Sequence, residues 1–317
     1  MLHRNATRQV RASLAAAFAL LLGANLQAAS APEKKPRKAQ VEAHWLDPDK
    51  TQPAGTKYCT FPSKTIGQDV SYHLYLPPDY AAHSDRRYPV IYWLHGLGGT
   101  QQTGARFFVP HLDAAIRQKV MPPVIAVMVN GMVSSFYNDS PDGKLPVESV
   151  IIQDLIPHID ATYRTLAKRE GRAVQGYSMG GWGAAHLGFK YPDLFGVVCI
   201  DAGALLEADA IREHQAGIIV RAFGDDMENF AANHPRTLIE KNADRVRGRT
   251  FVRIGVGAND NLLTVNQAYH ALLDRLRISH EYVVVPDVAH MARVYYAKLG
   301  VKGFEFYNKA LVGSAGQ

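Results

Sequence analysis

The segment from Gly176 to Gly180 holds a serine, Ser178, between two glycines in the pattern Gly-x-Ser-x-Gly. It joins a short apolar run to a stretch rich in glycine and alanine, as expected of a turn between a strand and a helix. A serine in such a turn adopts a strained backbone conformation, and glycines two positions away relieve the clash with the strand and the helix. An ordinary tight turn that happens to contain serine is the alternative. The context favours a nucleophilic serine that attacks an acyl carbon.

A serine hydroxyl needs a base that removes its proton, and His290 is the best candidate. It lies on a short loop after the apolar run 283–285, which predicts the last strand. The chain contains 13 histidines, most of which we expect at the surface or in packing roles. Three of them, His158, His186 and His270, fall within helical patterns and are therefore assigned structural roles.

The imidazole in turn needs a carboxylate that fixes its tautomer and stabilises its charged form. Asp260 follows the predicted strand 251–256, the strand directly before the one that leads to His290. Asp225 and Asp226, after the apolar run 218–223, are the rival acids. We prefer Asp260 because of its place next to the histidine-bearing strand.

Two backbone amides are candidates for stabilising the oxyanion of a tetrahedral intermediate. One is the amide of Met179, next to the serine. The other is the amide of Leu97, in the glycine-rich loop 94–99 that follows an early predicted strand. Taken alone, this loop is equally well explained as a plain turn between a strand and a helix.

Short apolar runs alternate with helical stretches from residue 88 onwards, so the sheet that positions these residues is predicted to be mostly parallel, with helices on both faces. An antiparallel hairpin is predicted before it, over 57–76. Predicted strands cover 90–94, 124–129, 172–177, 195–200, 218–223, 251–256 and 282–285, and predicted helices lie near 106–119, 147–163, 179–190, 264–277 and 291–298. The segments 131–146 and 202–249 are predicted to be long excursions that carry substrate-binding loops or a small cap.

The net charge of +6 suggests a nucleic-acid partner, but its distribution argues against one. Residues 1–40 hold seven basic residues and one acidic residue, and the remainder holds 28 of each. A nucleic-acid groove needs basic residues clustered on the folded body. We therefore predict no nucleic-acid partner.

The N-terminus has the order of features of a secretory signal peptide. Three arginines precede the apolar run 14–22, and small residues around Ala28 to Ala31 offer a cleavage site. As a helix the run would span only about 14 Å, too short for a permanent membrane anchor. A frayed N-terminal helix is the alternative. The predicted organisation is a signal peptide over 1–31, an exposed spacer over 32–56 and a catalytic domain over 57–317, in a periplasmic or secreted protein.

The two cysteines, Cys59 and Cys199, are too few for a disulfide framework or a cysteine-based metal site. A bridge between them is possible in an oxidising compartment, but two free thiols are preferred. The chemistry assigned to the serine requires no metal and no organic cofactor. The oligomeric state is left open.

The segments Tyr88–Gly96 and Gly176–Gly181, together with Asp260 and His290, resemble the putative-esterase family of α/β-hydrolases, from about residue 57 to the C-terminus. This family includes feruloyl esterases, S-formylglutathione hydrolases, enterochelin esterases and mycolyltransferases. The resemblance implies an α/β-hydrolase fold and a triad in the order serine, aspartate, histidine. The expected activity is a serine esterase that hydrolyses acetyl- or feruloyl-type carboxylic esters through an acyl-enzyme intermediate.

The motifs leave the substrate open. The leader separates the chain from cytoplasmic S-formylglutathione hydrolases and favours extracellular small-molecule or saccharide esters. Phe136, Tyr137 and Ser140, on the loop after the strand 124–129, are candidate substrate-binding residues. The alternative is that the two aromatic residues pin this loop to the body. Trp182 is assigned to the core.

Three other functions compete with an esterase. An acyltransferase would use the same triad with an acceptor alcohol in place of water. A peptidase is weaker, since no extra domain that selects peptide ends is apparent. A non-catalytic ligand-binding protein on a hydrolase scaffold is the alternative from another class.

Overall fold

The structure is a computed structural model that describes residues 44–211, 217 and 222–312. The predicted signal peptide and the first part of the predicted spacer lie outside these residues. Within the described chain, no helix is both long enough and apolar enough to span a bilayer.

In the part of the chain that the structure describes, the domain is built on one twisted eight-stranded sheet, with strands in the order β1-β2-β4-β3-β5-β6-β7-β8. Strands β1 and β2 form the predicted antiparallel hairpin, β2 pairs antiparallel with β4, and all later neighbours are parallel. The bounds are β1 Thr56–Ser63, β2 Gln68–Tyr75, β3 Val90–Leu94, β4 Ile125–Val129, β5 Arg172–Tyr177, β6 Val197–Asp201, β7 Phe251–Gly257 and β8 His280–Val285. The mostly parallel sheet with its N-terminal hairpin is confirmed.

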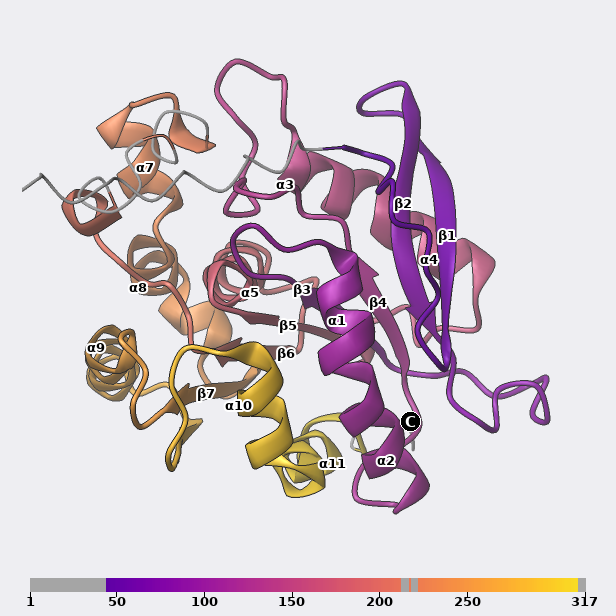
Figure 1. Ribbon diagram of the computed structural model, residues 1–317. Helices are drawn as coiled ribbons and strands as arrows, with labels where there is room; N and C mark the ends of the chain where they lie inside the picture. The colour runs from indigo at the N-terminus through magenta and orange to yellow at the C-terminus, as the bar shows by residue number, and fades with distance from the viewer. Residues whose placement is uncertain (1–43, 212–216, 218–221, 313–317) are drawn as a thin grey trace, which may run out of the picture. The chain divides into compact units, whose positions relative to one another are not determined.

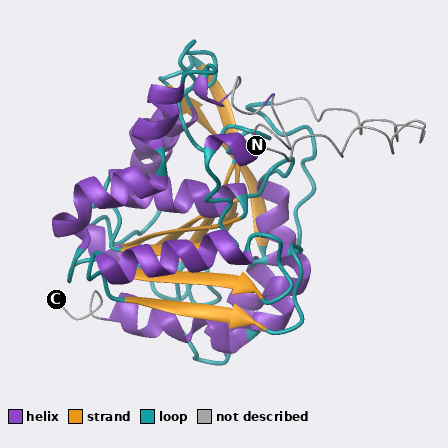
Figure 2. Ribbon diagram, turned by 90° about the vertical axis from the view of Figure 1, so that its left-hand side faces the viewer, coloured by secondary structure: helices purple, strands orange, loops and turns teal. Residues whose placement is uncertain are grey.

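Helices cover both faces of the sheet, as Figures 1 and 2 show, because β3 to β6 are buried along their whole length and must be shielded on both sides. Two hydrophobic cores result, one on each face. One face is covered by α1 Gln101–Phe107, α2 Val109–Arg117, α10 Ala292–Leu299 and α11 Glu305–Val312. The other is covered by α4 Ile156–Thr162, α5 Met179–Lys190, α8 Pro235–Val246 and α9 Leu263–Arg275.

Two predicted helices are subdivided. The helix expected over 106–119 is two helices, α1 and α2, that meet at Phe108, just before Pro110 at the start of α2. The helix expected over 147–163 begins as α3 Val147–Ser149, continues as the π-helical segment η1 Val150–Leu155 and ends as α4.

The prediction of a strand over 218–223 is wrong for residues 222 and 223, the part of this range that the structure describes. Residues 218–221 lie outside the described chain, Ala222 and Phe223 are helical, and β6 pairs directly with β7. Phe223 is buried against the rings of Trp182 and Phe230. Phe223 is therefore apolar because it packs in an aromatic cluster outside the sheet, and not because it belongs to a strand.

Within the excursion 202–249, the sequence analysis missed the helices α7 Met227–Asn233 and α8, and the described residues 208–211 are helical as well. Asp226, one of the two rival acids, caps α7 by accepting hydrogen bonds from the amides of Glu228 and Asn229. The C-terminal elements η3 Val301–Phe304 and α11 were also missed.

Part of the predicted spacer is attached to the domain. The amide of Asp47, which is buried, donates to Ser71 Oγ at 2.9 Å. The side-chain amide of Gln102, on α1, donates to the carbonyl oxygens of Asp49 and Thr51, both at 2.8 Å. Residues 44–55 therefore lie along β2 and α1.

Both cysteines are free thiols, as preferred. Cys59 lies on β1 and Cys199 on β6, five strands away in the sheet. At the usual strand spacing this is about 24 Å, so this fold does not allow a bridge between them.

Candidate active site

Ser178 lies in a sharp turn between β5 and α5, with φ 61° and ψ −116°. This left-handed conformation is strained for a residue with a side chain, and the surrounding backbone enforces it. A Cβ atom on Gly176 would lie under 3.0 Å from the backbone of Gly180, and one on Gly180 would collide with the carbonyl oxygen of Leu94. Both glycines are therefore required for β5, the turn and α5 to pack this closely.

The structure brings Ser178, His290 and Asp260 together. Ser178 Oγ lies 2.9 Å from His290 Nε2, and His290 Nδ1 lies 2.9 and 3.0 Å from the two carboxylate oxygens of Asp260. The carboxylate can only accept, so the ring donates from Nδ1 and its Nε2 accepts the serine proton. The Asp260 side chain is fully buried, whereas that of His290 is 29% exposed.

The loops that carry Asp260 and His290 support each other. The amide of Ala258 donates to the carbonyl of Val285 at 2.8 Å, and that of Asn259 donates to the carbonyl of Val288 at 2.9 Å. Asp260 Oδ1 also accepts from the amide of Leu262 at 2.8 Å, which orients the carboxylate. The spacing between Asp260 and His290 is thus held by backbone hydrogen bonds.

The two candidate oxyanion amides border the serine. Met179 is the first residue of α5, where backbone N–H groups lack partners within the helix. Leu97 follows Gly96, at which an added Cβ would lie 3.2 Å from Ser178 Cβ. Neither amide donates a hydrogen bond to another group of the described chain. Both donors are available to an oxygen beside Ser178.

His95 and Tyr137 hold the glycine-rich loop in place. The amide of Gly131 donates to His95 Nε2 at 3.2 Å, so the ring carries its proton on Nδ1 and donates to the carbonyl of Gly96 at 2.9 Å. Burial lowers the pKa of His95 to about 4, which keeps the ring neutral in this role. The hydroxyl of Tyr137 donates to the carbonyl of His95 at 2.9 Å.

The predicted substrate-binding residues are buried. Phe136 packs against Trp182 with ring centroids 5.3 Å apart, and Tyr137 is fully covered. Ser140 Oγ donates to the carboxylate of Asp142 at 2.7 Å, within its own loop. In this structure the two aromatic side chains pin the loop to the body, the alternative that the sequence left open. Trp182 is buried, as predicted.

Asp201 forms a buried polar cluster beneath the turn that carries Ser178, and sequence reasoning missed it. Its carbonyl accepts from the amide of Ser178 at 2.9 Å. Its carboxylate accepts from Gln175 at 2.6 Å and from the hydroxyls of Tyr295 and Tyr296, each at 2.9 Å. An aspartate at the end of an otherwise apolar strand was the signal that could have revealed this cluster.

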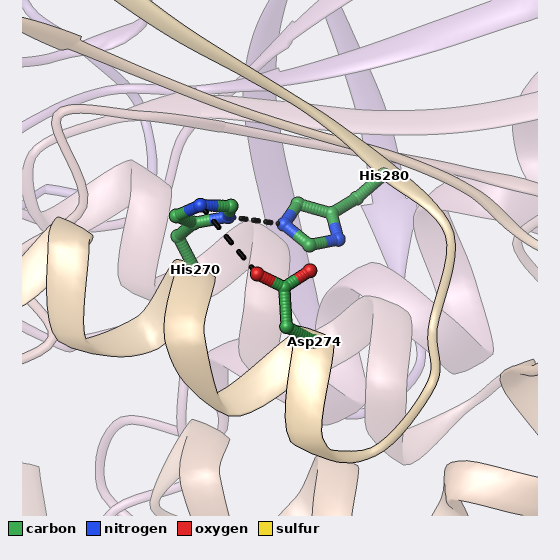
Figure 3. A group of neighbouring side chains, drawn as sticks. All are labelled: His270, Asp274 and His280. Atoms are coloured by element: carbon green, nitrogen blue, oxygen red, sulfur yellow. Dashed lines mark hydrogen bonds and ion pairs between the residues drawn. The ribbon is translucent and has the colours of Figure 1, made fainter.

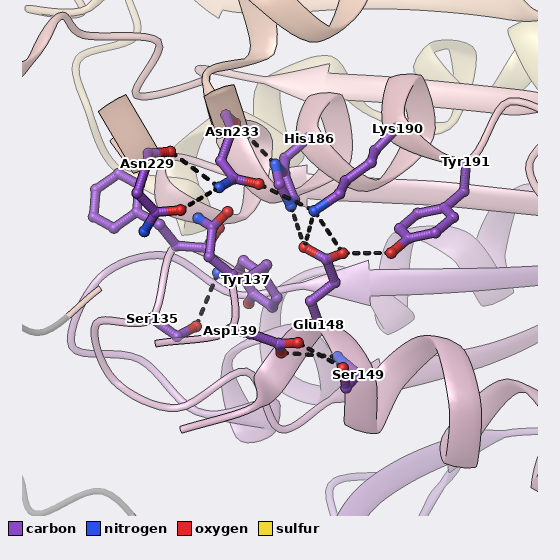
Figure 4. Close-up of polar contacts among 12 residues, drawn as sticks. Ser135, Tyr137, Asp139, Glu148, Ser149, His186, Lys190, Tyr191, Asn229 and Asn233 are labelled. Carbon is purple, nitrogen blue, oxygen red and sulfur yellow. Dashed lines mark hydrogen bonds and ion pairs between the residues drawn. The ribbon is translucent and has the colours of Figure 1, made fainter. Parts of the chain in front are cut away.

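A second buried carboxylate, Glu148, joins α3 to α5, the helix that follows Ser178 (Figure 4). It accepts from His186 Nε2 at 2.6 Å, from Lys190 Nζ at 2.8 Å and from the hydroxyl of Tyr191. Burial alone would raise the pKa of Glu148, but the hydrogen bond from His186 and the charge of Lys190 outweigh it and lower the pKa to about 2. The carboxylate is therefore charged in the folded protein over the ordinary pH range.

A cavity of about 320 Å³ lies away from the triad, at the amino-terminal ends of β7 and β8. Arg249, Phe251, His280 and Lys309 contribute to its lining. Substrates of parallel α/β sheets bind at the opposite, carboxyl ends of the strands. The triad occupies those ends, so this cavity is separate from the candidate active site.

The sheet order, the strained serine turn and the order of serine, aspartate and histidine define an α/β-hydrolase. The chain matches the family described as "Esterase: Putative esterase" over residues 63–317, and it belongs to this family.

Relatives agree with this assignment. The chain is 38% identical over 138 residues to "Esterase MT1326" of Mycobacterium tuberculosis, a match that covers 42% of this chain and 29% of the relative. It is 30% identical over 180 residues to "Endo-1,4-beta-xylanase/feruloyl esterase" of Xylanibacter ruminicola, covering 54% of this chain and 24% of the relative. The matches thus span less than a third of each relative's length. A solved ferulic acid esterase has the same fold, with a TM-score of 0.69 and 21% identity over 82% of this chain and 100% of that one.

Proposed function

We propose that this chain is a serine esterase that hydrolyses carboxylic esters through an acyl-enzyme intermediate. The observation that carries the proposal is the hydrogen-bonded series from Ser178 Oγ through His290 to Asp260, built on a strained turn. Membership of the esterase family supports ester hydrolysis as the reaction class.

In the first half of the proposed reaction, Ser178 Oγ attacks the ester carbonyl carbon while its proton passes to His290 Nε2. The oxyanion accepts hydrogen bonds from the amides of Met179 and Leu97, and the carboxylate of Asp260 stabilises the imidazolium. When the intermediate collapses, the carbon–oxygen bond to the alcohol breaks and His290 gives its proton to the departing oxygen.

In the second half, His290 removes a proton from water, and the resulting hydroxide attacks the acyl carbon. The second tetrahedral intermediate releases Ser178 Oγ, which takes the proton back from His290, and the carboxylic acid leaves. All groups required belong to this chain.

The proposed acyl group is acetyl or feruloyl in type. Two exposed apolar side chains support an apolar or aromatic acyl group. Met291 directly follows His290 in sequence and is 49% exposed, and Leu97, in the loop whose Gly96 borders Ser178, is 36% exposed. The relative from Xylanibacter ruminicola carries feruloyl esterase in its name, which agrees with this choice. The proposed location is periplasmic or secreted, on the strength of the N-terminal sequence.

The test is a panel of acetyl, butyryl and feruloyl esters, given to the wild-type protein and to Ser178→Ala. We expect turnover to fall to the uncatalysed level in the variant, and a fluorophosphonate probe to label only the wild type. Turnover at the wild-type rate in Ser178→Ala would sink the assignment. Absence of labelling in folded wild-type protein would favour a non-catalytic ligand-binding protein. Transfer of the acyl group to an added sugar alcohol, in preference to water, would identify an acyltransferase.

A further inference from the structure

Three side chains with metal-binding atoms gather at the amino-terminal end of β8, as Figure 3 shows. His270 and Asp274 lie one turn apart on α9, so they share a face of that helix, and His280 is the first residue of β8. From His280 to Val285 the strand runs about 16 Å towards the loop that carries His290. The cluster is therefore remote from the candidate active site.

The short connection between α9 and β8 fixes this arrangement. The amide of Arg277 donates to the carbonyl of Asp274, and that of Ile278 donates to the carbonyl of Leu273, both at 2.9 Å. Arg277 has φ 56°, which turns the chain sharply, and Ile278 is buried. The helix and the strand are therefore held at a constant separation.

The ring of His270 is also held in place. It stacks on Tyr282 with ring centroids 4.4 Å apart and an angle of 3° between the planes. This contact restricts rotation of the imidazole, so less conformational entropy is lost when the ring binds a ligand.

The tautomer of His280 leaves a lone pair directed at His270. His280 Nδ1 lies 2.8 Å from the carbonyl oxygen of Ile278, which can only accept, so Nδ1 carries the proton. The other nitrogen, Nε2, faces His270 Nδ1 at 2.6 Å. A hydrogen bond from the non-ligating nitrogen to a backbone carbonyl is the usual support of a metal-bound histidine.

We propose that His270, His280 and Asp274 bind a divalent transition-metal ion of the zinc type. One ligand atom from each residue lies within 4.8 Å of the other two. Ligands around tetrahedral zinc stand about 3.4 Å apart, so the two nitrogens separate by less than 1 Å and the carboxylate moves inwards. Asp274 Oδ2 now lies 3.6 Å from the other ring nitrogen of His270, Nε2, and because its side chain is 63% exposed the carboxylate has room to turn towards the two facing nitrogens. Two imidazoles favour zinc, cobalt or nickel over calcium and magnesium, which prefer oxygen ligands.

The ion would act as a structural link, since no step of the proposed reaction uses it. It would join α9 to β8, the strand at the end of the sheet order, where β7 is the neighbour on one side. Binding to the folded state alone stabilises it, and at a free metal concentration one hundred times the dissociation constant the melting temperature should rise by about 5 °C for a domain of this size.

The test uses full-length protein without a histidine tag, freed of metal with a chelator and titrated with Co²⁺. A four-coordinate cobalt site gives strong visible absorption, which weakly held six-coordinate cobalt on surface histidines does not. The variants are His280→Gln and Asp274→Asn, and the matched control is His83→Gln, which removes an exposed histidine outside the cluster. Thermal unfolding with and without Zn²⁺ provides a second readout that is independent of esterase activity.

We expect one equivalent of strongly absorbing cobalt in the wild type and in His83→Gln, and loss of that absorption in His280→Gln. In Asp274→Asn the affinity should fall at least about tenfold. This substitution is at an exposed position, so it tests the site even if His280→Gln does not fold. Equal cobalt spectra and equal zinc-induced melting shifts in the wild type, Asp274→Asn and His83→Gln would overturn the proposal and leave an ordinary hydrogen bond between two histidines.

Discussion

Replacing Glu148 with Gln should destabilise the protein strongly without touching the triad. The Glu148 side chain is only 7% exposed and accepts hydrogen bonds from His186, Lys190 and Tyr191. A carboxyl group whose pKa falls from its usual 4.5 to about 2 on folding stabilises the folded state by about 3 kcal/mol at neutral pH. Breaking a buried ion pair by removing one partner costs about 3–5 kcal/mol by mutational precedent. The energy worked from the pKa and the energy known for broken buried ion pairs agree, and each is a large part of a typical free energy of unfolding.

The sign of the pH dependence follows from the direction of the shift. A carboxyl with a lowered pKa in the folded state contributes its full stabilisation above pH 4.5, and the contribution disappears as the pH falls towards 2. The difference between wild type and Glu148→Gln should therefore shrink from about 3 kcal/mol at pH 7 to roughly 1.5 kcal/mol at pH 3.

Urea unfolding at a series of pH values measures this difference. Asp244→Asn is the matched control, because it also turns a carboxylate into an amide but removes an exposed pair, Asp244 with Arg247, whose loss should cost under about 1 kcal/mol. The reasoning is refuted if Glu148→Gln costs no more than Asp244→Asn at pH 7. It also fails if the cost of Glu148→Gln is the same at pH 7 and pH 3.

Two further pairs of substitutions, each a test and its control, probe the geometry of the candidate site. Asp260→Asn should lower kcat for ester hydrolysis by about 10⁴-fold, because the amide no longer holds the imidazole tautomer. Asp226→Asn should leave kcat unchanged, since Asp226 caps α7. The reverse result would identify Asp226 as the acid. Gly180→Ala should lower both the melting temperature and kcat, since the added Cβ would collide with the carbonyl oxygen of Leu94. The control is Gly143→Ala, at a position with positive φ but open space, which should lower the free energy of unfolding by only about 1 kcal/mol. Wild-type activity in Gly180→Ala would show that the turn tolerates displacement.

The sequence predicted the candidate site best where a residue with a reactive side chain follows an apolar strand. Ser178, Asp260 and His290 could be singled out because each follows an apolar strand, and the structure brings them within hydrogen-bonding distance. The parallel strands were predictable for a related reason: their residues are buried on both faces, so apolar runs are continuous.

Tertiary contacts explain what the sequence could not predict. Phe223 is apolar because it packs in an aromatic cluster, and nothing local distinguishes that from a strand. Glu148 meets His186 and Lys190 across 38 and 42 residues of chain, a separation that no spacing rule connects. In α8, by contrast, Pro235 at the start and apolar residues at helical spacing were local signals of a helix.

Because residues 44–55 are attached to the sheet and to α1, the folding unit starts at or before residue 44 and not at residue 57, the predicted start of the domain. Gln102 of α1 is held by the carbonyls of Asp49 and Thr51, and α1 follows directly on the glycine-rich loop that contains Leu97. A recombinant fragment that starts at residue 57 would leave the buried side-chain amide of Gln102 without these acceptors and would loosen the support of that loop. Fragments for crystallisation or directed evolution should therefore retain the chain from residue 44 onwards.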